Sequence, residues 1–332
     1  MARIETPFWN HLTALLWAAL AGACGSALEP AADPALAQTD QRLSREDPLQ
    51  AARAFWEEFA PLCSWYPSKE NCEDGDMTLF NGLLCASGQD LGCQAVRASQ
   101  GADGRFWRSP RRVDGNLGQT KSFSRDMTMG VLLYLARTRD TGAAERWLGW
   151  IDSNRPCVMK KPWGGGCLVR GLYRVCRDDE NSSCTLTPGV WALMGRVWGY
   201  LGLSRHGEMN RWEGSDGDIT AIEAEINEPG YQLHLAGVGV LLKQYMGVSS
   251  GPRQEVASTL AGRQPNNPFF LYLRDGVTEE VRQKTLALCP QRENGTAFRK
   301  FQWSWERSDS SEAWRESMGW ECIFLHNLIR NR

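Results

Sequence analysis

Apolar residues gather into long segments along most of the chain, and six of these segments are apolar around nearly the whole circumference of a helix. A helix that is hydrophobic on all sides has to be buried on all sides. Strand-like alternation with hairpin turns is scarce by comparison. The pattern therefore predicts buried helices within residues 76–88, 124–136, 187–202, 229–247, 267–276 and 313–329.

A second set of helices is predicted between the buried ones, and these helices are amphipathic. In the segment 141–152, Ala143, Trp147, Trp150 and Ile151 form one apolar stripe, while the charged residues lie elsewhere. Comparable segments occupy residues 48–60, 90–99, 217–227, 251–262 and 278–288. Buried and half-buried helices in alternation are what two concentric rings of helices require, so the sequence predicts an all-α domain.

Local signals mark several helix ends. Thr187 and Asn267 are cap-type residues, and each precedes a proline at the first helical position, where the missing N–H removes no hydrogen bond. Gly247 and Gly276 stand where the end of a helix often needs a left-handed residue. We therefore expect two helices to begin at these prolines and two to end at these glycines.

The N-terminal residues have the pattern of an export signal. Residues 1–23 contain Arg3 and then the apolar run LTALLWAALAGA, which is shorter than the roughly 20 residues of a membrane-spanning helix. Small residues lead to Cys24, and the segment resembles a bacterial lipoprotein signal, which implies a lipid on Cys24. Ordinary cleavage after Ala37 is the alternative. Residues 24–47 are rich in Ala, Pro and polar residues, so we predict a flexible tether.

The cysteines support export. Setting Cys24 aside leaves ten of the 11 cysteines, an even number, and disulfides persist in exported proteins. Neighbours in the sequence suggest five pairs, although spacing alone does not prove connectivity. They are Cys63 with Cys72, Cys85 with Cys93, Cys157 with Cys167, Cys176 with Cys184, and Cys289 with Cys322.

Charge and motifs exclude several classes of function. The chain has 37 Lys plus Arg against 39 Asp plus Glu, and this balance removes the electrostatic argument for nucleic acid as a partner. The glycine cluster at residues 164–166 precedes Cys167 and lacks the strand and the Lys-Ser/Thr of a phosphate loop. Neither HExxH nor GxSxG occurs. We therefore expect no cofactor and no metal site.

The helix alternation, the SRDM and RFWRSP segments near the start of one buried helix, and the Trp-rich loops resemble the α/α-toroid glycoside hydrolases and polysaccharide lyases. The resemblance is one of architecture and covers residues 48–331. It implies that residues 48–332 form a single (α/α)6 toroid and that ligands bind at the mouth bordered by the N-terminal ends of the inner helices. An irregular helical bundle is the alternative.

Two acids at such helix starts are the first catalytic candidates, Asp76 and Asp126. Neighbouring helix axes lie about 8–10 Å apart, close to the roughly 6.5–9.5 Å carboxyl separation of inverting glycosidases. A helix N-terminus favours an ionised carboxylate, so we assign Asp126 as the base. Asp76 is the acid if the loop around Trp65 and Tyr66 covers it and raises its pKa. Helix capping is the alternative for both residues.

Glu213, which follows a tryptophan in RWEGSDGD, is the substitute for the acid. Glu306 is a further carboxylate whose position is compared with the others. The alternative for the group of Glu213, Asp216 and Asp218 is a solvated acidic loop or a site for a bound cation. Distances between these carboxylates decide whether any two of them flank one bond.

Tryptophans and arginines are the candidates for substrate binding. Trp107, Trp212 and Trp303 lie in irregular stretches, where flat indole rings suit the apolar faces of sugars in a polysaccharide or oligosaccharide. Arg108, like the arginines that follow it and like Arg125, suits a uronate or sulfate group. Packing of the rings and solvation of the arginines are the alternatives.

Hydrolysis is therefore the predicted activity, carried out by an exported, lipid-anchored glycoside hydrolase of an extracellular or envelope polysaccharide. A polysaccharide lyase is the first alternative, because Tyr231 and His234 lie three residues apart on one helical face and Arg125 would neutralise a uronate. A core position for His234 is the competing interpretation. A lipoprotein that binds glycan or protein without catalysis is the second alternative.

Overall fold

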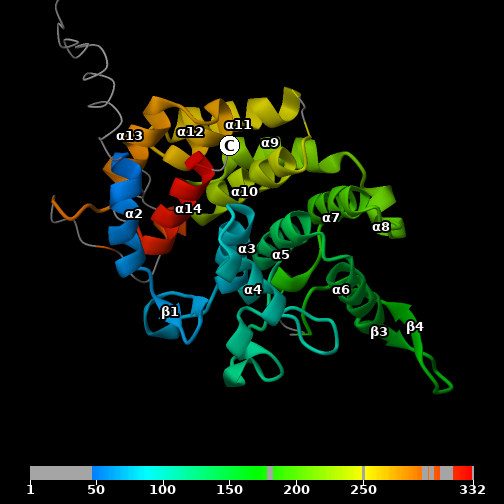
Figure 1. Cartoon of the computed structure of the whole chain (residues 1–332). Helices are drawn as coiled ribbons and strands as arrows, with labels where there is room; N and C mark the ends of the chain where they lie inside the picture. Colours follow the sequence, from blue (N-terminus) through cyan, green and yellow to red (C-terminus); the bar gives the residue numbers. More distant parts are fainter. Residues whose placement is uncertain are drawn as a thin grey trace, which may run out of the picture. The chain divides into compact units, whose positions relative to one another are not determined.

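The computed structural model of the chain describes residues 47–177, 182–248, 251–293, 298, 303–306 and 317–330 (Figure 1). The predicted signal peptide, Cys24 and residues 24–46 of the predicted tether lie outside these residues. From Asp47 onward the chain forms one compact unit.

Helices dominate the described residues, which form thirteen α-helices and two small antiparallel sheets. The helices are α2 (Pro48–Glu58), α3 (Met77–Ala86), α4 (Asp90–Ala98), α5 (Arg125–Thr138), α6 (Thr141–Ser153), α7 (Pro188–Leu201), α8 (Gly207–Arg211), α9 (Ser215–Ile226), α10 (Tyr231–Tyr245), α11 (Gly251–Arg263), α12 (Pro268–Asp275), α13 (Glu279–Leu288) and α14 (Gly319–Arg330). The strands are β1 (Leu62–Cys63) with β2 (Tyr66–Pro67), and β3 (Cys157–Lys160) with β4 (Cys167–Arg170). The prediction of a mostly helical protein is confirmed.

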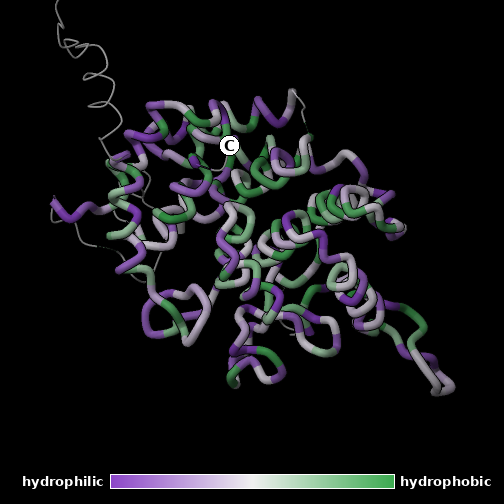
Figure 2. The backbone as a smooth tube through the Cα atoms, in the orientation of Figure 1, coloured by the Kyte–Doolittle hydropathy of each residue, from purple (hydrophilic) through white to green (hydrophobic). Residues whose placement is uncertain are grey.

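Burial follows the predicted alternation. The segments predicted as buried helices contain α3, α5, α7, α10, α12 and α14, and α3 is buried at every residue from Met77 to Cys85. The helices α2, α4, α6, α11 and α13 bury only part of their surface. Figure 2 shows hydrophobic residues concentrated along α7 and α10. Residues 313–316 of the last predicted segment lie outside the described residues.

The predicted end signals act as expected at most positions. The Asn267 side chain accepts hydrogen bonds from the N–H groups of Phe269 and Phe270 at 3.1 and 3.4 Å, and α12 begins at the next proline. Gly247 and Gly276 adopt φ values of 73° and 72°. Thr187 also precedes a helix, but its side chain makes no capping hydrogen bond.

Contacts between the buried helices bring distant parts of the chain together. Helix α3 packs against α4 and α5, and α5 packs against α7 and α10. Helix α10 packs against α9, α11 and α12, while α14 packs against α2, α13 and α3. One continuous hydrophobic core runs through these helices and contains the fully buried Trp56, Trp147, Trp198 and Trp303. The start of α3 therefore lies near helices that are far from it in the sequence.

Helices α3 and α5 approach until their backbones touch. A Cβ atom on Gly130 would lie 2.1 Å from the carbonyl oxygen of Thr78, and one on Gly82 would lie 2.2 Å from the carbonyl oxygen of Gly130. Both glycines have ordinary helical backbone angles, so a side chain is excluded by the lack of space and not by the backbone conformation. The contact fixes the relation between the first turns of the two helices, where Asp76 and Asp126 stand.

Five disulfides join the ten cysteines of this unit, and they are the five pairs suggested by the sequence. Cys289, at the end of α13, is joined to Cys322 of α14, and the other four bridges close short local loops. Such a set fits an exported protein, because disulfides persist in oxidising compartments. Within the described part of the chain, no helix is both long and apolar enough to span a membrane.

The glycine contact generates a stability prediction. We expect Gly130→Ala to lower the free energy of unfolding by about 1–3 kcal/mol, because the added methyl overlaps the backbone of α3. Gly149→Ala is the control, since its Cβ atom would meet no other atom within 4 Å on the exposed side of α6. Helix propensity alone should make this control more stable by about 0.5–1 kcal/mol. Urea unfolding followed by circular dichroism measures both changes, and equal stability of the two variants would contradict the packing argument.

Candidate functional site

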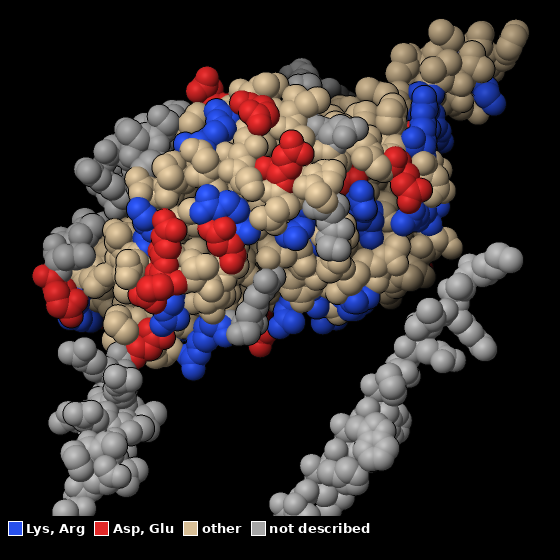
Figure 3. Space-filling model, turned by 90° about the horizontal axis from the view of Figure 1, so that it is seen from above, with Lys and Arg blue, Asp and Glu red and all other residues tan. Residues whose placement is uncertain are grey.

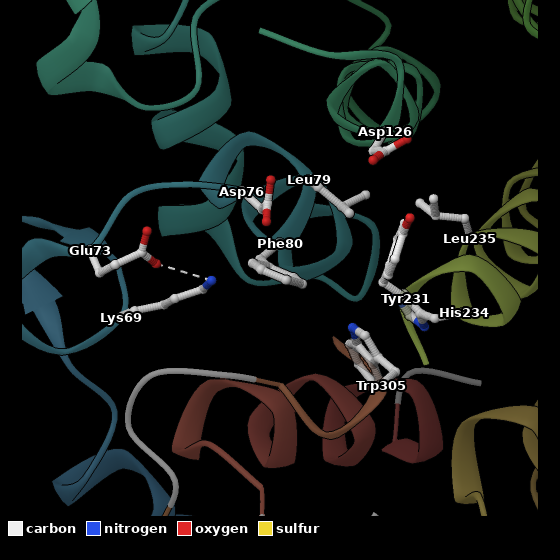
Figure 4. A pocket seen from close by; sticks show the side chains of 10 residues that line it. All are labelled: Lys69, Glu73, Asp76, Leu79, Phe80, Asp126, Tyr231, His234, Leu235 and Trp305. Carbon is white, nitrogen blue, oxygen red and sulfur yellow. Dashed lines mark ion pairs between the residues drawn. The ribbon is translucent and has the colours of Figure 1, made fainter. Parts of the chain in front are cut away.

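A cavity of about 460 Å³ opens where α3, α5 and α10 begin. Asp76 occupies the N-cap position of α3 without a capping hydrogen bond from its side chain, Asp126 lies in the first turn of α5, and Tyr231 is the first residue of α10. All three line the cavity, and Figure 4 shows the two aspartates across the cavity from Trp305. The structure thus brings together the two acids selected from the sequence.

An arginine-rich loop positions Asp76. The N–H group of Thr78 donates to the carbonyl oxygen of Arg108 at 2.9 Å, which docks the loop on the first turn of α3. The guanidinium of Arg108 then pairs with Asp76, with Nη1 3.1 Å from Oδ1, and also donates to the carbonyl oxygens of Gly75 and Lys121. These contacts use Arg108 within the protein, so its role is to position Asp76.

The same loop also secures Asp74, which is buried just before the cavity. Arg112 Nη2 lies 2.7 Å from Asp74 Oδ1, and the Ser109 hydroxyl donates to Oδ2 at 2.8 Å. Arg111 lies 3.5 Å from the same carboxylate. The arginines that follow Arg108 therefore anchor the loop, and the proposed pairing of this run with a substrate uronate is not what the structure favours.

Asp126 has a different environment from Asp76. Burial raises the pKa of Asp126, the negative charge of Asp76 raises it further, and Arg125 and Arg108 act in the opposite direction. No ion pair to Asp126 occurs among the described residues, whereas Asp76 has Arg108 as a direct partner. The helix N-terminus was expected to keep Asp126 ionised as a base. Burial and the charge of Asp76 act in the opposite direction, so Asp126 becomes the better candidate for the acid and Asp76 for the base.

A second cavity, of about 490 Å³, shares Asp126, Tyr231 and Leu235 with the first. Arg125 and Glu223 line it as well. The pKa of Glu223 is also raised by burial, with Arg125 and Lys243 opposing and Asp126 adding to the rise. Asp126 therefore stands where the two cavities meet.

Aromatic rings complete the first cavity. Trp305 is 3% exposed and stacks on His234, with ring centroids 3.9 Å apart and planes 6° from parallel. Burial lowers the pKa of His234 well below its ordinary value, so the imidazole is neutral. Tyr231 is 53% exposed, and Figure 4 shows its hydroxyl pointing toward Asp126. Tyr231 is therefore the most accessible ring beside the two acids.

The other acids selected from the sequence whose side chains are described lie outside the first cavity, although Asp216 lines the second. Glu213 forms an exposed ion pair with Arg205, with a nitrogen to oxygen distance of 2.7 Å, and lines neither cavity. Asp216 is neither solvated nor open to a cation. Burial alone would raise the pKa of Asp216, but Arg196 and Lys243 bind its carboxylate at 2.8 and 2.9 Å and hold the pKa low. The side chains of Asp218 and Glu306 lie outside the described set.

The tryptophans selected as sugar platforms are packing residues. Trp107 is 5% exposed and lies under Arg105, and Trp303 is fully buried and stacked on Phe80 with centroids 4.7 Å apart. Trp212 is partly buried, and its Nε1 donates to Glu208 at 3.1 Å. None of the three lines either cavity, and the same is true of the pair Trp65 and Tyr66, which were expected to cover Asp76.

Sequence reasoning missed three charged side chains that the cavities contain. Lys69 and Glu73 form an ion pair of 3.1 Å at one end of the first cavity, as Figure 4 shows. Glu223 lines the second cavity. No spacing in the sequence marks these three residues. Trp305, which belongs to the Trp-rich loops noted in the sequence, lines the first cavity. Among the described residues, no group of three or more His, Cys, Asp or Glu is arranged to hold a metal ion.

The raised pKa of Asp126 leads to a prediction about stability. The stability that Asp126 contributes is complete below its ordinary pKa of 3.8 and is lost as the pH rises through the raised value. Asparagine carries no charge, so Asp126→Asn should raise the melting temperature at pH 7 and give no advantage at about pH 3. Scanning calorimetry at both pH values measures the difference. Glu213→Gln is the control and should change little, because an exposed ion pair contributes little to stability.

An Asp126→Asn variant that is less stable than the parent at pH 7 would contradict this assignment of the environment. A second measurement tests the cause directly. Asp76→Asn removes the like charge, so the carboxyl resonance of Asp126 should titrate at a lower pH by nuclear magnetic resonance.

Comparison of the chain with protein-family models, with curated proteins and with solved structures found no match. The interpretation of the two cavities accordingly depends on their own geometry and charge.

Proposed function

We propose that the protein is an exported glycoside hydrolase whose acid and base are Asp126 and Asp76. One observation carries the proposal: two carboxyl groups from neighbouring helices line one cavity and have unequal environments, since Asp76 is paired with Arg108 while burial raises the pKa of Asp126. Pairs of titratable groups pushed apart in this way mark acid and base roles. Tyr231 provides an accessible ring for a sugar beside them.

The proposed reaction cleaves one glycosidic carbon–oxygen bond with water. Protonated Asp126 donates its proton to the leaving oxygen, and Asp76, held by Arg108, takes a proton from the water that attacks the anomeric carbon. The carbon–oxygen bond to the leaving sugar breaks as the bond to the water oxygen forms. These roles are the reverse of those expected from helix position alone.

The two cavities favour a polymer or oligosaccharide as the substrate. They lie on either side of Asp126 and share Tyr231, so a chain that occupies both places an internal bond at the acid. Arg125 in the second cavity gives that side a cation, which suits an acidic sugar. Cleavage within a chain is therefore the proposed mode of action.

We also propose that the helices close into a double ring, as in the α/α toroids. Support comes from the alternation of buried and half-buried helices and from the contact between α14 and α3, the last and first buried helices.

Export and a lipid on Cys24 belong to the same proposal. The apolar run before Cys24 and the five disulfides support export, and the Ala- and Pro-rich residues after Cys24 suit a tether. A substrate outside the cell or in its envelope would be within reach of such a protein.

A lyase is the second candidate, because Tyr231 and His234 both line the first cavity and Arg125 lies in the adjoining one. In that reaction Tyr231 would remove the proton next to a uronate carboxylate, a carbon–carbon double bond would form as the carbon–oxygen bond to the leaving sugar breaks, and the leaving oxygen would take up a proton, so no water would be consumed. The neutral, fully buried His234 weakens the candidate, since neither ring nitrogen has a hydrogen-bond partner in the described structure.

Turnover of defined polysaccharides tests the proposal. A panel of neutral and uronate-containing polymers is incubated with the parent, and new reducing ends are measured. Asp126→Asn and Asp76→Asn should each lower the rate by about 10²–10⁴, the usual contribution of a general acid or base. Glu213→Gln should keep the parent rate.

The product separates the two candidates. A different outcome is an Asp126→Asn variant that is as fast as the parent and releases an unsaturated product that absorbs in the ultraviolet. That outcome would contradict the hydrolase proposal and support the lyase. Reducing ends released equally fast by all three variants would remove both aspartates from the mechanism.

A further inference from the structure

We propose that the β3–β4 hairpin binds the surface of an anionic lipid bilayer. The hairpin is defined as residues 155–172, and it projects from the helices in Figure 1. It takes no part in either cavity, so this inference is independent of the proposed hydrolase activity.

Exposed apolar side chains cover the hairpin. Trp163 at the tip is 92% exposed, and Val158 is 71% exposed. Met159, Leu168 and Val169 are exposed too. Because successive residues of a strand point to opposite faces, the pairs 158–159 and 168–169 give both faces of the ribbon exposed apolar groups. A protein partner would cover one face, whereas the headgroup region of a bilayer surrounds an inserted ribbon.

The charge of the hairpin selects the kind of bilayer. Residues 155–172 contain Arg155, Lys160, Lys161 and Arg170 and no acidic residue. Among the described residues, none forms an ion pair with Lys160, Lys161 or Arg170. The projection at the upper right of Figure 3, which corresponds to the rightmost part of Figure 1, likewise shows Lys and Arg without Asp or Glu. Basic residues near a membrane are attracted to anionic headgroups.

Local bonds hold the two strands of the hairpin together. A two-stranded ribbon is at best marginally stable in water. Here the Cys157–Cys167 disulfide joins the strands, and Arg155 Nε donates to the carbonyl oxygen of Gly171 at 3.0 Å. The tip therefore presents Trp163 and the two lysines on a fixed support, and tryptophan is the residue that favours the membrane interface.

Vesicle sedimentation tests the inference with the full chain carrying Cys24→Ser, which removes the predicted lipid site. The vesicles contain phosphatidylcholine alone or mixed with phosphatidylglycerol. We expect binding to the mixed vesicles that weakens as salt is raised. The double variant K160Q/K161Q should lower the partition coefficient about fivefold per lysine, and Trp163→Ser should lower it in both salt conditions.

Matched controls are Trp65→Ser and Lys121→Gln, which change exposed residues outside the hairpin. Any contribution from the apolar N-terminal run is the same in all variants, so differences report on the hairpin. Hairpin variants that bind mixed vesicles as tightly as the parent would overturn the inference. Self-association of the parent in ultracentrifugation, lost with Trp163→Ser and without a preference for anionic vesicles, would overturn it in favour of a contact between copies.

Discussion

The close approach of α3 and α5 determines most of what the site can do. Gly82 and Gly130 let the two backbones touch, and no other residue type fits either position. Helix α3 is held on its other side in a similar way, since a Cβ atom on Gly92 of α4 would lie 2.6 Å from the carbonyl oxygen of Asn81. Because α3 is confined by backbone contacts, the backbone at its start has a fixed position relative to the start of α5.

A fixed pair of acids needs unequal surroundings to have unequal roles, and the arginine loop supplies them. Arg108 binds Asp76, while Arg112 and Ser109 bind the buried Asp74 below it. Asp126 is left with burial as the largest influence on its proton. One loop between α4 and α5 thus pairs the acid on one side of the cavity with a cation and leaves the acid on the other side without an ion-pair partner among the described residues.

Much of this architecture follows from the sequence, because periodicity and end signals act locally. The buried helices, the glycine ends and the disulfides between neighbouring cysteines were all predictable from short stretches. Side chains in loops were not, since their surroundings come from distant residues: Trp303 packs on Phe80 while Trp305 reaches the cavity. The raised pKa of Asp126 was not predictable for the same reason, because its burial depends on α3 and α10 as well as on its own helix.

The order of the disulfides has a consequence for the biogenesis of the protein. From Cys63 onward, the cysteines are bonded in consecutive pairs: the first with the second, the third with the fourth, and so on. In an exported chain, oxidation in the order of emergence from a translocation channel would therefore produce the native set directly. A free thiol at Cys24 would enter this series first, bond with Cys63 and shift every later partner by one. A lipid on Cys24 would block that thiol, so the proposed anchor would also prevent Cys24 from taking the partner of another cysteine.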